Sequence, residues 1–230
     1  MRTARYAIYY APPEGSALWA FGRRWFGRDG GSGHDCGLPG FSRARLDVLT
    51  ASSRIYGFHA TLKAPFRLGT APAALRAAVE AFAGRQPPVQ APPLRLCAIH
   101  GFLALVPRGP APGADRLAAD CVRAFEPFRA PPTHAETARR RAAAGLSLSQ
   151  SALLARWGYP YVMAQFRFHL KHTDRIADTA ERMAVMQRIL PLAAPFRSVP
   201  LHIEQICLCR QDEPGQAFLI EERYPLKGTP

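Results

Sequence analysis

The chain has 230 residues and a mass of 25.3 kDa, with 48% hydrophobic and 20% charged residues, a composition typical of a folded globular protein. Its formal charge of +13 favours anionic partners, but nearly all of that charge is arginine, and an arginine-, alanine- and proline-rich chain is also what a GC-rich genome encodes. No apolar run reaches the roughly 18 to 20 residues that cross a bilayer, and no secretory signal pattern is present, so we expect a cytoplasmic protein without membrane association.

The five cysteines favour reduced thiols. Cys207 and Cys209 share one face of a predicted strand and lie too close in sequence for an ordinary disulfide. No CxxC pair and no other ligand cluster has the spacing of a zinc site. We therefore expect no metal and no other cofactor.

Hydrophobic periodicity and turn residues predict a mixture of strands and helices in chain order. In the first half, we expect strands at 5–10, 56–66, 94–99 and 102–107, helices at 16–26, 41–51 and 71–83, and a flexible glycine-rich loop at 27–40. In the second half, we expect helices at 114–128, 135–157 and 175–190, the last with Asp174 as its N-cap, and strands at 166–173, 201–209 and 217–224.

The turn-rich segment 108–113 is the best boundary within the chain. On each side of it, a strand with a histidine is followed by a helix and then by two more strands. This repeated order predicts an α+β fold. We expect a single two-lobed domain over residues 1–230, with pseudo-two-fold symmetry, an antiparallel sheet with helices in each lobe, strand exchange between the lobes, and an active-site cleft between them.

The two histidine strands each turn polar side chains onto one face. Period-two alternation places His59, Thr61 and Lys63 together on the first strand, and Arg167, His169, Lys171 and Thr173 together on the second. Residues two apart on a strand face are about 6.8 Å apart, so a histidine and a hydroxyl can address one phosphate. A second histidine from the opposite side would allow in-line displacement, with one imidazole acting as base and the other as acid.

Three segments, RYAIYYAPP, YGFHATLKAPF and WGYPYVMAQFRFHL, carry a resemblance to a known family. They resemble the two-histidine (2H) phosphoesterases with paired His-x-Thr motifs, which include RNA 2′,3′-cyclic phosphodiesterases and RNA-end ligase-like proteins. More narrowly, they resemble a bacterial branch of unknown function associated with phosphonate-utilisation gene clusters. The resemblance spans most of the chain and implies a bilobal fold, a central cleft and catalysis without a metal.

Residue by residue, the resemblance carries over His59 and Thr61 from the first motif and His169 from the second. It implies that His59 and His169 are catalytic and that Thr61 binds phosphate. Lys171 stands where the second threonine is expected, and we predict that its ammonium group binds a phosphate oxygen instead. The same charge lowers the pKa of a nearby imidazole, which favours His169 as the base and His59 as the acid.

Further candidate substrate contacts lie near the motifs, and each has an alternative structural role. Arg54 and Arg167 could instead be ordinary surface residues that contact no substrate. The aromatic candidates could instead pack in the core or at the cavity rim. These candidate contacts are Arg54, Lys63, Arg167, Thr173 and Tyr10, with Tyr56 and Tyr161 as further rings that stack on a base or sugar.

The expected function is metal-independent hydrolysis of a cyclic phosphate or a small phosphodiester, in phosphonate or ribose-phosphate metabolism, by a monomeric enzyme. A small phosphorylated or cyclic-phosphate substrate is favoured over RNA. Because the second threonine is missing, two alternatives stay open. One is a non-catalytic module that binds a phosphate ligand or an RNA end, and the other is an RNA ligase-like 2H protein.

Overall fold

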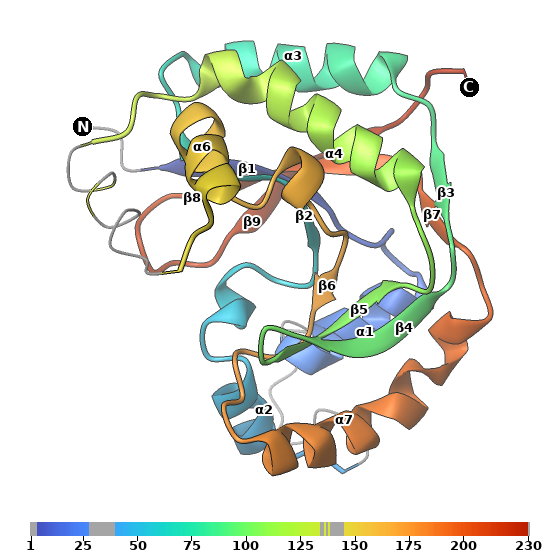
Figure 1. The fold of residues 1–230 in the computed structure, drawn as a ribbon. Helices are drawn as coiled ribbons and strands as arrows, with labels where there is room; N and C mark the ends of the chain where they lie inside the picture. Colours follow the sequence, from blue (N-terminus) through green and yellow to red (C-terminus); the bar gives the residue numbers. More distant parts are fainter. Residues whose placement is uncertain (1–3, 28–39, 134–135, 137, 139–144, 230) are drawn as a thin grey trace.

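The computed structural model describes residues 4–27, 40–133, 136, 138 and 145–229 (Figure 1). The strands form a four-stranded sheet in the order β2-β1-β8-β9, a three-stranded sheet in the order β4-β5-β6, and a small β3-β7 pair, and all neighbours are antiparallel. The strands are β1 (Arg5–Tyr10), β2 (Ala60–Arg67), β3 (Val89–Ala91), β4 (Leu94–Ile99), β5 (Phe102–Pro107), β6 (Leu170–Lys171), β7 (Leu201–Ile203), β8 (Gln205–Gln211) and β9 (Leu219–Pro225).

Each of the three sheets combines strands from both sides of segment 108–113. The β8-β9 hairpin from the second half joins β1 and β2, and β6 joins the β4-β5 hairpin from the first half. The predicted α+β class with antiparallel sheets is therefore confirmed.

Helices cover the outer faces of the two larger sheets. Figure 1 shows α3 and α4 over the four-stranded sheet, and α7 along the far side of the three-stranded sheet. The α-helices are α1 (Ala17–Phe26), α2 (Arg43–Leu49), α3 (Pro72–Arg85), α4 (Pro112–Phe125), α6 (Leu148–Trp157) and α7 (Thr179–Ala193), and the 3₁₀ turns are η1 (Ser53–Ile55), η2 (Glu126–Phe128), η3 (Met163–Gln165) and η4 (Ala194–Arg197). None of the described helices is both long and apolar enough to cross a membrane.

Local sequence explains several helix ends. Ser16 caps α1 by accepting a hydrogen bond from the Trp19 N–H at 3.1 Å, and Gly27 ends that helix with φ = 65°. Ser147 and Gln150 form a capping box at the start of α6. Gly158 closes α6 with φ = 74°, a backbone conformation that glycine adopts without strain.

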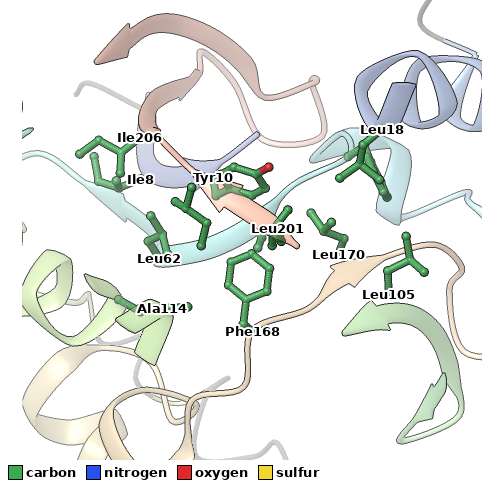
Figure 2. Packing of buried hydrophobic residues seen from close by; sticks show 14 of the residues in the cluster. Ile8, Tyr10, Leu18, Leu62, Leu105, Ala114, Phe168, Leu170, Leu201 and Ile206 are labelled. Atoms are coloured by element: carbon green, nitrogen blue, oxygen red, sulfur yellow. The ribbon is translucent and has the colours of Figure 1, made fainter. Parts of the chain in front are cut away.

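One hydrophobic core joins the two larger sheets. Figure 2 shows Tyr10, Leu62, Phe168 and Leu170 pointing into it, and the rings of Tyr10 and Phe168 are 5.8 Å apart. The apolar faces predicted for the two histidine segments are buried at Phe58, Ala60, Leu62, Phe168 and Leu170. This burial fixes the opposite, polar face of each segment toward a shared space.

The helix predicted at 175–190 begins later than expected, and Asp174 is not its N-cap. Helix α7 starts at Thr179, and Asp178 is its cap, accepting bonds from the Ala180 and Glu181 N–H groups. Asp174 instead accepts hydrogen bonds from the backbone N–H groups of Ser52 and Ser53, at the start of η1. Because these long-range contacts occupy the Asp174 carboxylate, it does not cap the helix, and α7 begins after the second aspartate.

Other predicted segments also differ in extent. The strand expected at 56–66 begins only at Ala60, so His59 lies just before β2 rather than within it. The strand expected at 166–173 contains only β6, because 163–165 is a 3₁₀ turn and 166–169 makes no ladder. The helix expected at 135–157 is interrupted, since Gly145 adopts φ = 96° and α6 starts only at Leu148. The loop predicted at 27–40 lies almost wholly outside the described residues.

Candidate active site

One cavity of about 480 Å³ is lined by both motif histidines. Thr61 on β2 and His59 just before that strand reach it from one side, and Lys171 on β6 and His169 just before that strand reach it from the other. The segment 158–161 after α6 contributes the remaining wall, including Tyr159. The fold therefore brings two histidines that are far apart in sequence to the same space.

The ring of His59 is held on three sides. Its Nδ1 lies 2.9 Å from the Gly57 carbonyl oxygen, and its Nε2 lies 3.1 Å from the Thr61 hydroxyl. The ring also stacks on Tyr9, with centroids 3.8 Å apart. Because a carbonyl oxygen only accepts, Nδ1 carries a proton, and in the neutral ring Nε2 accepts the Thr61 hydroxyl proton.

His169 is held in the same manner as His59. Its Nδ1 lies 2.8 Å from the carbonyl oxygen of Arg167, again two residues earlier in the chain. Nε2 is therefore the nitrogen left to exchange a proton with a ligand. The Phe102 ring, with its centroid 5.6 Å away, packs against this imidazole.

The environment of His169 disfavours its protonated form. Burial is the largest cause and lowers the pKa of His169, the bond to the Arg167 carbonyl opposes this, and the charge of Lys171 lowers the pKa further. The effect of Lys171 has the expected sign, but burial contributes more. A neutral imidazole near pH 7 is suited to act as a base.

Lys171 sits at the cavity edge with a weak internal partner. Its Nζ is 3.4 Å from Asp174 Oδ1 and 5.2 Å from the centroid of the Phe102 ring, and its side chain is 35% exposed. Asp174 already accepts shorter bonds from the Ser52 and Ser53 N–H groups, at 2.6 and 2.9 Å, and from the Ser53 hydroxyl at 2.6 Å. The ammonium group can therefore turn to a ligand without leaving Asp174 unpaired.

The structure corrects the prediction that Lys63 contacts substrate. The side chain is buried, and its Nζ donates to the Val122 carbonyl at 3.3 Å and to Glu126 Oε2 at 2.8 Å. The reason is an irregularity in β2. Tyr9 pairs with Thr61 and Ile8 pairs with Lys63, so one extra residue lies between them and turns Lys63 to the opposite face.

Thr173 and Tyr10 are also structural, contrary to the prediction that they contact substrate. Thr173 is fully buried, and its hydroxyl accepts a hydrogen bond from the Leu103 N–H at 3.0 Å. Tyr10 is 1% exposed within the core. Neither residue lines the histidine cavity.

The two arginine candidates do not line the cavity either. Arg54 is bound to Asp47 at 2.5 Å and to the Thr50 hydroxyl at 3.1 Å. Arg167 is exposed and lines a different cavity beside β4 and β5. By contrast, Tyr56 and Tyr161, the other two aromatic candidates, do line the histidine cavity.

Sequence reasoning missed two cavity residues on β1. Arg5 and Tyr9 line the cavity, whereas Tyr6, Ile8 and Tyr10 face the core. The period-two alternation in RYAIYY already places Arg5 and Tyr9 on the face of the strand opposite to Tyr10. Aromatic and apolar residues occur on both faces of this strand, so the sequence alone did not show which face is polar.

Comparison with known proteins places the chain in a family. The sequence profile described as "Protein of unknown function (DUF1045)" matches residues 61–219. The chain belongs to the DUF1045 family. The predicted membership of a bacterial branch of unknown function is thereby confirmed.

Curated relatives of this DUF1045 chain are longer proteins. The chain is 40% identical over 235 residues to "Ribose 1,5-bisphosphate phosphokinase PhnN" of Janthinobacterium sp. (strain Marseille), covering 97% of this chain and 51% of the relative. It is 34% identical over 218 residues to the protein of the same name from Laribacter hongkongensis (strain HLHK9), covering 93% and 50%. The chain thus spans about half the length of the curated relatives it matches.

Among solved structures, this DUF1045 chain is similar to Escherichia coli LigT. The complex of LigT with 3′-AMP has a TM-score of 0.43 at 15% identity, covering 97% of this chain and 98% of LigT. The complex with NADP+ has a TM-score of 0.39 at 14% identity, covering 98% and 99%.

Proposed function

We propose that this protein is a phosphoesterase that hydrolyses a cyclic phosphate or a small phosphodiester by acid–base catalysis between His59 and His169. The supporting observation is that the two histidines line one cavity and that a backbone carbonyl oxygen contacts Nδ1 of each ring, so that Nε2, which in His59 also contacts the Thr61 hydroxyl, is the nitrogen that transfers the proton. Two imidazoles whose Nδ1 atoms are held in the same way, on elements that line one cavity, suit an in-line displacement at phosphorus.

In this mechanism, Nε2 of neutral His169 takes a proton from the attacking water as its oxygen forms a bond to phosphorus. The bond from phosphorus to the leaving oxygen breaks, and that oxygen receives a proton from Nε2 of protonated His59. The Thr61 hydroxyl and the Lys171 ammonium group bind the non-bridging oxygens. His169 then releases its proton to solvent and His59 takes one up, which restores the starting state.

The proposed substrate class is a ribose-phosphate metabolite with a cyclic phosphate. The relatives that share this sequence over half their length are named for a kinase of ribose 1,5-bisphosphate. A cyclic diesterase that opens a ribose cyclic phosphate would form a ribose phosphate monoester, which is the chemical class of that named kinase substrate. We propose that the chain acts as one two-lobed unit, because each sheet takes strands from both halves. We also propose that it acts as a cytoplasmic monomer.

The test is an assay of ribose and nucleoside cyclic phosphates in the presence of a chelator, with wild type, His59→Ala and His169→Ala. We expect each substitution to lower kcat by about 10²- to 10⁴-fold, the usual contribution of a positioned acid or base. His202→Ala is the matched control, because His202 is exposed on β7 and does not line the cavity. Turnover that persists in both alanine variants would contradict the proposal.

A second candidate function is a binding module for a phosphate ligand or an RNA end. The observation that favours it is the lysine in place of the second threonine, with its ion pair to Asp174. This function would be supported if the wild type bound the ligand without turning it over and if the Lys171→Thr variant behaved in the same way. A steep loss of affinity with added salt would indicate RNA rather than a small metabolite.

A further inference from the structure

Arg5 is held in the histidine cavity by a neutral partner. Its Nε and Nη2 donate to the Gln211 side-chain oxygen, at 2.8 and 2.5 Å. Gln211 is 1% exposed, and its own amide donates to the Gln216 carbonyl at 2.6 Å, which fixes its orientation. The Phe218 ring lies under the guanidinium, 5.4 Å from centroid to Cζ. Gln211 and Phe218, both uncharged, therefore orient Arg5 and leave its positive charge unneutralised.

This arrangement differs from that of other arginines in the protein. Many are paired with carboxylates, among them Arg43, Arg54, Arg67, Arg129 and Arg210. For Arg5, no carboxylate of the described residues lies within 4.0 Å of a side-chain nitrogen. A fixed guanidinium whose charge is left uncompensated in a cavity is suited to bind an anion.

Tyr9, a second residue that lines the cavity, has a hydroxyl without a hydrogen-bond partner among the described residues. This hydroxyl is buried. Burial raises the pKa of Tyr9 well above its usual value, while the charge of Arg5 acts in the opposite direction. The phenol therefore keeps its proton and can donate it to a ligand. A buried hydroxyl without a partner is costly, so a ligand that accepts its hydrogen bond gains affinity.

The spacing along β1 separates Arg5 from the histidine pair. Tyr9 stacks on His59, whereas Arg5 is four residues earlier on the same face, about 13 Å away between Cα atoms. Arg5 therefore approaches the cavity at a point removed from His59, where it would contact a different part of the same ligand.

We propose that Arg5, assisted by the Tyr9 hydroxyl, binds a second phosphate of the substrate, a monoester joined to the cyclic phosphate by a sugar-sized spacer. This inference rests on the proposed function, because it takes the histidine pair as the place where the cyclic phosphate binds. It narrows the substrate class to sugar phosphates that carry two phosphoryl groups.

The experiment compares ribose 1,2-cyclic phosphate with and without a 5-phosphate, measuring kcat/KM and the calorimetric Kd for each. For wild type we expect a preference of roughly 10- to 100-fold for the 5-phosphorylated compound, the range expected for hydrogen bonds to a charged group. Arg5→Gln should bring this ratio close to one. Tyr9→Phe should lower it severalfold while leaving stability unchanged or higher, because the hydroxyl that is removed has no partner in the described structure.

The matched control is Arg210→Gln. It removes the same charge from the residue next to Gln211, but Arg210 is paired with Asp212 and does not line the cavity. We expect it to keep the wild-type ratio. A wild-type ratio near one would overturn the inference. It would also be overturned if Arg5→Gln lowered kcat/KM equally for both compounds and Tyr9→Phe lowered it for neither.

The outcomes also separate this inference from the proposed function. If neither compound is turned over, the proposed function fails, and the Kd ratio decides the role of Arg5 by itself. A dinucleotide with a 2′,3′-cyclic phosphate serves as the third ligand. If its affinity exceeds that of the 5-phosphorylated sugar and also depends on Arg5, the second anion is the next phosphate of RNA and the assignment to a sugar monoester is wrong.

Discussion

His172 follows the proposed phosphate ligand Lys171 but is enclosed by aromatic rings. Its ring centroid is 5.1 Å from those of Phe21 and Phe58 and 5.6 Å from that of Trp25, and the residue is fully buried. Its Nδ1 lies 3.1 Å from the Leu170 carbonyl oxygen, while Nε2 has no hydrogen-bond partner among the described residues. Burial lowers the pKa of His172 from 6.5 to about 4. We predict that this residue makes the fold sensitive to acid.

The size of the effect follows from the difference between the two pKa values. The unfolded chain takes up this proton near pH 6.5 and the folded chain only near pH 4, so the unfolded state binds more protons in that window. The contribution of His172 to stability is therefore complete above the unfolded pKa and is lost as pH falls toward the folded one. Linkage gives a loss of about 2 kcal/mol between about pH 7.5 and about pH 5, and about 3 kcal/mol in full.

The assay is urea unfolding of wild type and His172→Leu across this pH range. Leucine removes the titrating group and suits the apolar surroundings, so the free energy of unfolding of the variant should fall less steeply with acid. The lost bond to the Leu170 carbonyl is a cost that does not vary with pH, so the difference between the two proteins isolates the proton. A difference that stays constant from neutral pH to about pH 5 would refute the reasoning.

Three further substitutions test individual assignments. Lys63→Met should destabilise the fold by about 1 to 3 kcal/mol in urea unfolding, because Glu126 loses a buried partner. KM should stay at its wild-type value, and a raised KM would show that Lys63 contacts the substrate after all. Thr173→Val should likewise cost about 1 to 3 kcal/mol, since a buried N–H loses its acceptor, and a stability equal to wild type would show that the bond is not needed. Lys171→Met should raise the pKa of His169 and shift the acid limb of the kcat/KM profile to higher pH, and an unshifted limb would remove Lys171 from the electrostatics of that ring.

The parts of the fold that follow from local signals agree well with expectation. The β4-β5 hairpin has the predicted limits at 94–99 and 102–107, because alternating residues flank a tight turn. Helix α1 begins after the serine cap at residue 16 and ends at Gly27. In these segments, the residues that determine the structure lie within a few positions of one another.

The remaining differences arise from contacts between residues far apart in sequence. Asp174 is drawn from its expected capping position by backbone groups of Ser52 and Ser53, more than a hundred residues earlier. The inward turn of Lys63 depends on an extra residue in β2, which no local pattern indicates. Arg5 gains its place in the cavity through Gln211, 206 residues away. A single sequence read by periodicity contains no information about such partners.

The position of β1 in the middle of its sheet has a consequence for biosynthesis. β1 pairs with β2 on one side, but its other neighbour, β8, is made only after the residues between 10 and 205 have been translated. Until residues 205–211 have been synthesised, one edge of β1 stays open, and sheets with such long-range pairing fold slowly. Both histidines have already been synthesised by that stage, whereas the hairpin that holds Gln211 beside Arg5 has not. On the ribosome, the nascent chain would therefore acquire its catalytic side chains well before it acquires a completed pocket.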